Sequence, residues 1–158
     1  MELYFLRHGA AAARADWEGD DALRPLTDQG REEMARMAGL LARSAPALDA
    51  IVTSPYLRAS ETADIVAQHL DLQDKVVADD RLEPGFDAGR LRKLLKKFPE
   101  AQALLLVGHE PDFTTVIGAL TGGRVVLKKG GMAYVQNVDA SLSKCVLVWL
   151  VQPGITGA

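Results

Sequence analysis

The sequence is poor in cysteine, in long apolar runs and in excess positive charge. Its single cysteine, Cys145, excludes an intrachain disulfide framework. Cys145 lies in an apolar stretch where a thiolate would be poorly solvated, so we interpret it as a structural residue. No stretch approaches the roughly 20 apolar residues that cross a bilayer, and Arg7 and His8 interrupt the apolar start. These absences predict a soluble cytoplasmic protein that does not bind a membrane.

The balance of charge and apolarity is that of an ordinary globular domain. Eighteen basic and 21 acidic residues give a net charge of −3, and no block of Lys or Arg stands out. General binding of nucleic acid through a basic face is therefore excluded, and an anionic ligand would have to be held by a few placed arginines. With 48% hydrophobic residues, 158 residues can bury a real core, which predicts one domain over 1–158.

Short apolar runs alternate with helical patterns along most of the chain. Runs without polar alternation are typical of buried parallel strands, and apolar spacing of three and four residues indicates amphipathic helices. Thr27 is a suitable N-cap for the first helix, and Ser54-Pro55 is a start signal for the second. We expect strands at 3–6, 49–53 and 103–107, helices at 27–41, 55–70, 90–98 and 111–121, and closing strands at 125–127, 133–138 and 144–151.

This alternation predicts an α/β fold. We expect a three-layer α/β/α sandwich whose central sheet is mostly parallel and is completed by antiparallel strands. A further short strand is expected between the second and third helices. The segment 9–26 shows little periodicity, and long loops in compact domains are often functional.

Charged and polar residues follow three of the predicted parallel strands. Arg7-His8-Gly9 follows the first, 54–58 (SPYLR) the second, and 108–111 (GHEP) the strand at 103–107. Because ligands bind outside the carboxyl ends of parallel strands, we expect Arg7, His8, Arg58 and His109 to converge.

Two arginines and two histidines around one cleft favour a phosphoryl ligand. Guanidinium forks match phosphate oxygens, and the start of the second helix would direct free N–H groups to the same place. A divalent metal fits poorly beside Arg7, and no cofactor is expected. The chain has no glycine-rich nucleotide loop, and Cys145 lies elsewhere, which leaves a histidine as nucleophile. Neutral imidazole is nucleophilic, and neighbouring positive charge disfavours its protonation.

Three motifs in this order resemble the histidine phosphatase superfamily. They are LRHG at 6–9, SPYLRASETA at 54–63 and VGHEP at 107–111. The short chain, the segment 24–27 (RPLT) and the lack of a large inserted subdomain resemble the SixA branch, the phosphohistidine phosphatases. The resemblance implies a phosphoglycerate mutase-like fold. It also implies that His8 is the phosphorylated nucleophile and that Arg7, Arg58 and His109 bind the phosphoryl group.

The resemblance implies further roles around this centre. The Gly9 carbonyl would fix the His8 tautomer, and Gly9 would let the loop turn tightly. The general acid has two candidates: Glu83, in a segment that is one residue out of step with the family pattern, and Glu110, directly after the second histidine. Arg24 would either border the cleft or form a salt bridge within the loop.

The function expected from these features is metal-independent hydrolysis through a covalent phosphohistidine. The SixA resemblance implies a phosphorylated protein as substrate, such as a histidine phosphotransfer domain in signal transduction. An imidazole leaves a phosphoryl group more readily than an alkoxide does, so strong acid assistance is less necessary. Two alternatives stay open: a phosphatase of small phosphate esters, and a non-catalytic module that binds phosphate or a phosphoprotein. A phosphate or sulfate ion is expected to occupy the site in any of these cases.

Overall fold

The computed structural model describes residues 1–44 and 47–155. Over these residues the chain alternates strands with helices in the predicted manner. The strands are β1 (Glu2–Arg7), β2 (Ala50–Thr53), β3 (Val76–Ala78), β4 (Ala103–Gly108), β5 (Met132–Gln136) and β6 (Val146–Val151). The helices are α1 (Asp28–Ser44), α2 (Leu57–Leu70), α3 (Ala88–Leu95) and α4 (Asp112–Thr121).

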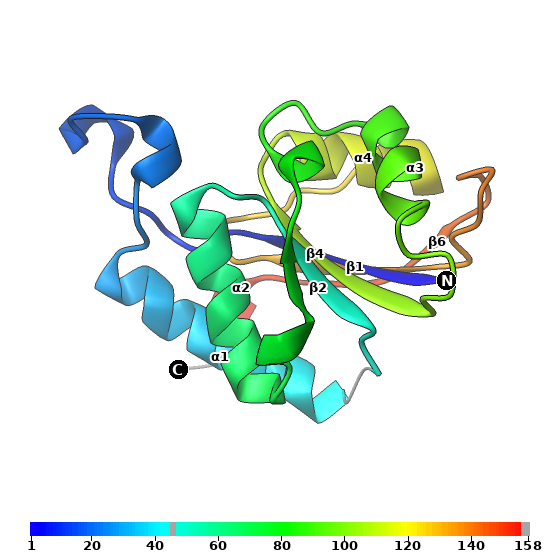
Figure 1. Cartoon of the computed structure of the whole chain (residues 1–158), viewed down its shortest axis with the longest axis horizontal. Helices are drawn as coiled ribbons and strands as arrows, with labels where there is room; N and C mark the ends of the chain where they lie inside the picture. Colours follow the sequence, from blue (N-terminus) through cyan, green and yellow to red (C-terminus); the bar gives the residue numbers. More distant parts are fainter. Residues whose placement is uncertain (45–46, 156–158) are drawn as a thin grey trace.

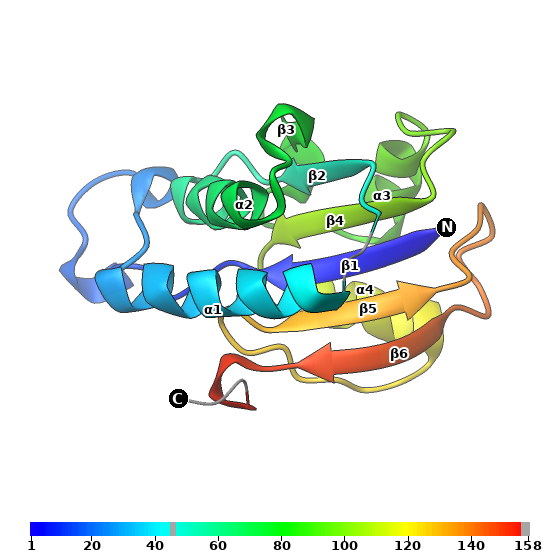
Figure 2. The same cartoon turned by 90° about the horizontal axis from the view of Figure 1, so that it is seen from below.

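The six strands form one mixed sheet in the order β3-β2-β4-β1-β5-β6. β3, β2, β4 and β1 are parallel, whereas β5 pairs antiparallel with β1 and β6 pairs antiparallel with β5. Figure 2 shows β2, β4 and β1 side by side with their arrowheads at the same edge. The predicted parallel sheet with antiparallel closing strands is therefore confirmed.

Helices cover both faces of the sheet, so the predicted three-layer sandwich is also confirmed. Alternate residues of β1 supply the two cores: Leu3 and Phe5 pack on the α3 and α4 side, and Tyr4 and Leu6 on the α1 and α2 side. Figure 1 shows the two helix pairs on opposite sides of the sheet. Because the parallel strands are buried on both faces, they read as continuous apolar runs.

Thr27 caps α1 as expected, since its Oγ1 accepts a hydrogen bond from the Gly30 N–H at 3.0 Å. Three other local predictions are wrong: the start of α2, the bounds of α3 and a strand at 125–127. α2 begins at Leu57 rather than at residue 55, because Tyr56 is still extended (φ −61°, ψ 132°) and the Ser54 hydroxyl is used elsewhere. α3 spans Ala88–Leu95 rather than 90–98, because the Asp87 carboxylate caps it earlier by accepting from the Arg90 N–H.

The segment 125–127 forms no strand. Its carbonyl groups are bonded by side chains instead of a neighbouring strand: Gln152 Nε2 donates to the Val126 carbonyl, and Arg7 Nη1 to the Leu127 carbonyl. The Val126 side chain is exposed, which an apolar strand pattern does not anticipate. This irregular segment runs past the sheet and contributes a backbone acceptor to one of the predicted site residues.

The long segment 9–26 extends beyond the arrowheads of β1 and β4 (Figures 1 and 2). It contains two short 3-10 helices, Arg14–Asp16 and Asp21–Leu23, and an isolated antiparallel bridge between Ala11 and Leu26. The loop therefore stands over the sheet edge where the predicted site residues emerge. Among the described helices, none combines the length and the apolarity that a membrane span requires.

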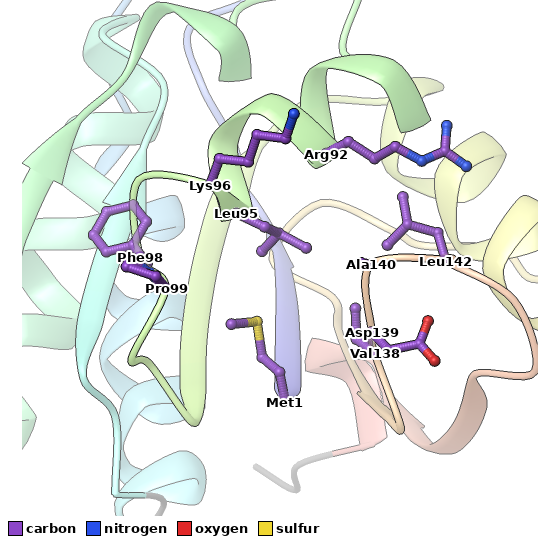
Figure 3. Close-up of a pocket in the computed structure, with 10 residues that line it drawn as sticks. All are labelled: Met1, Arg92, Leu95, Lys96, Phe98, Pro99, Val138, Asp139, Ala140 and Leu142. Atoms are coloured by element: carbon purple, nitrogen blue, oxygen red, sulfur yellow. The ribbon is translucent and has the colours of Figure 1, made fainter.

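A separate hollow lies at the opposite end of the sheet, where β1 begins. Figure 3 shows its lining, in which Met1, Leu95, Val138 and Leu142 gather below Arg92 and Lys96. These residues come from the start of β1, the end of α3 and the connection between β5 and β6. The hollow is mostly apolar and contains none of the predicted site residues.

Candidate active site

The predicted convergence at the carboxyl ends of the parallel strands is present. Arg7, His8, Arg58 and His109 line one open pocket of about 700 Å³. Arg7 is the last residue of β1, and His8 follows it directly. Arg58 lies in the first turn of α2, and His109 directly follows β4. The two imidazole rings lie 5.3 Å apart between centroids, so both face the same small volume.

The backbone of His8 is held from two sides. Its N–H donates to the Gly108 carbonyl at the end of β4, and its carbonyl accepts from the Gly130 N–H, both at 3.0 Å. Gly130 has φ +70°, a conformation that favours glycine. The side chain of His8 therefore projects from a rigid position at the strand end.

The His8 ring is fixed in one tautomer. Its Nδ1 lies 2.8 Å from the Gly9 carbonyl oxygen, which can only accept, so Nδ1 carries the hydrogen. The free lone pair is therefore on Nε2, where Arg58 Nε donates to it at 3.3 Å. This is the tautomer that a nucleophilic histidine needs, and the expected role of the Gly9 carbonyl agrees with the geometry.

Burial lowers the pKa of His8 to about 3. The hydrogen bond to the Gly9 carbonyl opposes this shift, while the positive charges of Arg58 and Arg7, and repulsion from His109 when that ring is protonated, reinforce it. The imidazole is therefore neutral at pH 7. Neighbouring cations contribute as expected, although removal of the ring from water is the larger cause.

Gly9 is required for close packing rather than for an unusual turn. A Cβ atom at this position would lie 2.8 Å from Met34 Cγ and 3.2 Å from the Gly30 carbonyl oxygen. The Gly9 N–H donates to Thr62 Oγ1 at 3.1 Å, and that hydroxyl donates to the Arg58 carbonyl at 2.7 Å. Thr62 thus links the nucleophile loop to the first turn of α2.

Arg58 is only 4% exposed and is held by a carboxylate from the long loop. Its Nη2 donates to Asp21 Oδ2 at 3.1 Å, and its Nη1 to the Asp21 carbonyl at 2.8 Å. Arg24 donates to the other carboxylate oxygen at 3.0 Å, so Asp21 bridges two guanidinium groups. Both options foreseen for Arg24 are present together, because it lines the pocket and forms a loop salt bridge.

Partial burial alone would raise the pKa of the Asp21 carboxyl, but Arg58 and Arg24 outweigh it and lower that pKa below its ordinary value. Asp21 is therefore an acceptor that fixes the arginines. It was absent from the sequence prediction, because a lone aspartate in an aperiodic loop carries no local signal of a contact with residue 58.

Two buried donors in the pocket have no hydrogen-bond partner among the described residues: Arg7 Nε and His109 Nδ1. Among the residues placed in the structure, the one hydrogen bond of the Arg7 side chain runs from Nη1 to the Leu127 carbonyl at 2.9 Å. Buried donors are almost always satisfied in native proteins. A pocket lined by two such groups is suited to an oxygen-rich anion that accepts from both.

His109 is 4% exposed, and its Nε2 lies 2.9 Å from Ser54 Oγ. Burial lowers the pKa of His109 to about 4, and the charge of Arg58 adds to this effect while Asp21 opposes it. The Tyr56 ring packs edge-on against His109 at 5.2 Å and also lies beneath the Arg58 guanidinium at 5.0 Å. His109 is therefore a second neutral imidazole.

The two candidate acids occupy different places. Glu110 lines the pocket, whereas at the 80s segment Pro84, and not Glu83, is among the described residues that do so. Both carboxylate oxygens of Glu110 accept hydrogen bonds from Thr114, one from its N–H at 3.0 Å and one from its hydroxyl. Glu110 therefore acts as a cap for the first turn of α4, and a carboxylate used in this way is poorly suited to donate a proton.

Seven further residues line the pocket beyond the candidates that the sequence indicated. Four of them carry polar or charged groups: Tyr56 and Asp21 beside Arg58, and the exposed cations Arg14 and Lys129. In the sequence, the place of Tyr56 in the second motif (54–63) was the only indication that it lies near the site. In the residues covered by the structure, no group of three His, Cys, Asp or Glu is arranged to hold a metal ion.

Known proteins resemble this chain in sequence and in fold. The family model of the histidine phosphatase superfamily (branch 1) matches residues 3–103. Phosphohistidine phosphatase SixA of Escherichia coli is 29% identical over 125 residues, covering 78% of this chain and 76% of that protein. An uncharacterized protein of Picosynechococcus sp. is 38% identical over 139 residues, covering 84% of this chain and 82% of the other.

A solved structure of the protein histidine phosphatase SixA complexed with tungstate superposes with a TM-score of 0.86. The two chains are 26% identical, and the match covers 98% of each. The expected phosphoglycerate mutase-like fold is thereby confirmed. Strand order, matched motifs and relatives agree, and the chain belongs to branch 1 of the histidine phosphatase superfamily.

Proposed function

We propose that this protein is a protein phosphohistidine phosphatase that works through a covalent phosphohistidine on His8. The observation that carries the proposal is the His8 ring: its Nδ1–H is fixed on the Gly9 carbonyl, so the Nε2 lone pair faces Arg58. The two unpartnered donors, Arg7 Nε and His109 Nδ1, supply hydrogen bonds for phosphoryl oxygens beside this nitrogen.

In the first step the lone pair of His8 Nε2 forms a bond to phosphorus while the bond from phosphorus to the leaving nitrogen breaks. The bonding pair stays with the leaving imidazole. If the other nitrogen of that ring carries a hydrogen, the imidazole leaves neutral and needs no proton from the enzyme. Arg7 and Arg58 hold the phosphoryl oxygens and keep the attack in line.

In the second step a water oxygen attacks the phosphorus of the phosphorylated His8. The bond between phosphorus and Nε2 breaks, and its electron pair returns to the ring. Orthophosphate leaves with both hydrogens of the water, one of them on a former phosphoryl oxygen. His8 is thereby restored in its Nδ1–H tautomer, still bonded to the Gly9 carbonyl.

The positions of the two candidate general acids, Glu83 and Glu110, support this substrate class. Glu83 does not line the pocket, and the carboxylate of Glu110 is engaged by Thr114. An alkoxide leaving group requires a proton donor, whereas an imidazole does not. This arrangement favours cleavage of a phosphorus–nitrogen bond over hydrolysis of a small alkyl ester.

A folded phosphoprotein is the partner that suits the pocket. The pocket is open, and the residues that the structure describes form no large subdomain over it, so a side chain presented by another protein can enter. Similarity to the SixA proteins supports the same class of partner, such as a histidine phosphotransfer domain in signal transduction. Tetrahedral tungstate in the related structure supports an oxyanion site. We propose that the reaction needs no metal ion, since guanidinium groups supply the positive charge.

The proposal is tested by trapping the intermediate. Brief exposure to a protein phosphorylated on histidine, or to phosphoramidate, should leave acid-labile, base-stable phosphate on His8, located by peptide mapping. His8→Ala should abolish both labelling and turnover. His69→Ala is the matched control, because His69 is an exposed histidine on α2 whose one hydrogen-bond partner among the described residues is the Ile65 carbonyl.

The rival functions give different results. Turnover of small alkyl phosphates at a rate equal to that of phosphohistidine protein would favour an ester phosphatase. A phosphate-dependent complex that forms normally with His8→Ala, together with no turnover by the unmodified protein, would identify a binding module. Loss of activity in EDTA that is restored by a divalent metal would contradict the metal-free mechanism.

A further inference from the structure

Ser54 forms a hydrogen bond with His109, the second histidine of the pocket, and this bond has no part in the reaction steps proposed above. It follows β2 directly and is fully buried. Its hydroxyl oxygen lies 2.9 Å from His109 Nε2 and accepts a longer hydrogen bond from the Tyr56 N–H at 3.3 Å. Ser54 therefore joins the carboxyl end of β2 to the loop that follows β4.

The direction of the Ser54–His109 bond follows from counting hydrogens. A serine hydroxyl has one hydrogen to donate, and a buried donor needs an acceptor. Among the described residues, His109 Nε2 is the only acceptor within hydrogen-bond distance of Ser54 Oγ, and the Tyr56 N–H already donates to that oxygen. The Ser54 hydroxyl therefore donates to Nε2, which must carry a lone pair.

A neutral imidazole whose Nε2 accepts carries its hydrogen on Nδ1. In His109 this Nδ1 is the buried nitrogen that lacks a partner, and the ring lines the phosphoryl pocket at 5.3 Å from the ring of His8. We propose that Ser54 is a positioning residue that fixes His109 as the Nδ1–H tautomer, so that His109 donates a hydrogen bond to the transferring phosphoryl group.

This role adds to the proposed function and rests on it. The low pKa of the buried His109 agrees with a neutral ring. His109 would then stabilise negative charge on a phosphoryl oxygen without transferring a proton. Both histidines of the site would carry a hydrogen on Nδ1: that of His8 is directed at the Gly9 carbonyl, and that of His109 at the ligand. Only His8 then has its Nε2 available as a nucleophile, because Nε2 of His109 is bonded to Ser54.

The tautomer can be read in the free protein. Long-range ¹H–¹⁵N correlation spectra of histidine-labelled protein distinguish a protonated from an unprotonated ring nitrogen. We expect His109 at pH 7 to show hydrogen on Nδ1 and a lone pair on Nε2, and the Nδ1–H resonance to shift on titration with inorganic phosphate. A protonated Nε2, or an Nδ1–H that does not respond to saturating phosphate, would overturn the proposal.

Ser54→Ala provides the second arm. It should replace the single tautomer by a mixture or by the Nε2–H form, and should lower kcat/KM for phosphoramidate by at least about tenfold. Thr53→Val is the matched control: it removes the adjacent buried hydroxyl, which bonds the Ser54 carbonyl and not His109. An unchanged tautomer in Ser54→Ala, or an equal loss of activity in both variants, would contradict the positioning role.

These measurements separate the positioning role from the proposed function. The tautomer and its response to phosphate are observed without turnover. A protein that hydrolyses no phosphohistidine could still show the Ser54-dependent Nδ1–H of His109, which would overturn the function and leave the positioning role intact. An active enzyme with His109 in the other tautomer would give the reverse result.

Discussion

Two hollows open at opposite ends of the central sheet, separated by the length of β1, about 20 Å at roughly 3.3 Å per strand residue. The pocket at the carboxyl ends of the parallel strands is lined by two buried histidines, the buried Arg58 and the half-buried Arg7, and two of the donors of these residues have no partner among the described residues. The hollow at the other end is lined by aliphatic side chains such as Leu95, Val138 and Leu142 (Figure 3). The same sheet therefore presents two concave surfaces of different chemistry.

The difference lies in what each surface costs the fold. Burying Arg7 Nε and His109 Nδ1 without hydrogen-bond partners among the residues that the structure places opposes folding, and such a cost is typical of functional sites. Burying Leu142 stabilises the fold by removing apolar surface from water. An apolar hollow is thus explained by packing alone, whereas the polar pocket is explained only by a ligand that accepts its free hydrogen bonds.

The largest expected effect separates the two regions by activity. His8→Ala should lower kcat/KM for phosphoramidate by about 10⁴-fold, because it removes the nucleophile. The free energy of unfolding should change by less than about 1 kcal/mol, since the side chain faces a pocket rather than a packed core. Steady-state hydrolysis and thermal denaturation measure both quantities. Residual activity above a few per cent would contradict a covalent role for His8.

The pH profile tests the electrostatics of the same pocket. For a histidine with an ordinary pKa of 6.5, the neutral, nucleophilic fraction would be about 25-fold smaller at pH 5 than at pH 7. Because burial lowers the pKa of His8 to about 3, the lone pair on Nε2 persists, and kcat/KM for phosphoramidate should lose less than about threefold through this group between pH 7 and pH 5. The rate should decline only as the pH approaches the lowered pKa, where the ring gains a proton.

A control separates this effect from titration of the substrate. The profile should be corrected for the independently measured ionisation of phosphoramidate, and protein stability should be checked at each pH. A corrected profile that halves near pH 6.5 would show that His8 titrates as if solvated. That result would contradict the buried geometry of the site.

The hollow at the other end should respond in the opposite way. Leu142 is only 6% exposed, and Leu142→Ala removes most of its side chain. This substitution should lower the free energy of unfolding by about 2–3 kcal/mol. The midpoint temperature should fall by about 4–10 °C, while kcat/KM stays within about twofold. A large loss of activity in a stably folded variant would show that the two regions are coupled.

Much of this contrast could be predicted from the sequence. Apolar runs located the strands β1, β2 and β4, and the residues directly after them proved to meet in one pocket. The alternation of strands and helices gave the layers, because parallel strands require crossover helices. Strong local patterns and the rule for strand ends were sufficient for these features.

Individual hydrogen bonds between distant segments could not be predicted, although the meeting of the strand ends could. The bond from Asp21 to Arg58 joins an aperiodic loop to α2, and the bond from Ser54 to His109 joins two strand ends. Ser54-Pro55 has the pattern of a helix start, but the Ser54 hydroxyl lies 2.9 Å from His109 Nε2. A single sequence shows which residues can donate or accept hydrogen bonds but not which distant partner each one meets.

The smallest expected effect concerns cations at the rims of the two regions. Arg14 and Lys129 line the mouth of the pocket and have no ion-pair partner in the described part of the chain. Exposed charges of this kind steer and orient a charged partner, each contributing about 1 kcal/mol or less. Replacing both by Gln should therefore raise KM for a phosphohistidine protein by about three- to tenfold.

The same double substitution should leave KM for phosphoramidate unchanged, because so small a substrate does not reach the mouth when it is bound at His8. Lys96→Gln, at the rim of the apolar hollow, is the matched control and should change neither constant. Equal losses for both substrates would mean that Arg14 and Lys129 act on the phosphoryl group itself. A loss with Lys96→Gln for the protein substrate alone would instead place part of the partner interface at the far end of the sheet, and would end the functional separation of the two hollows.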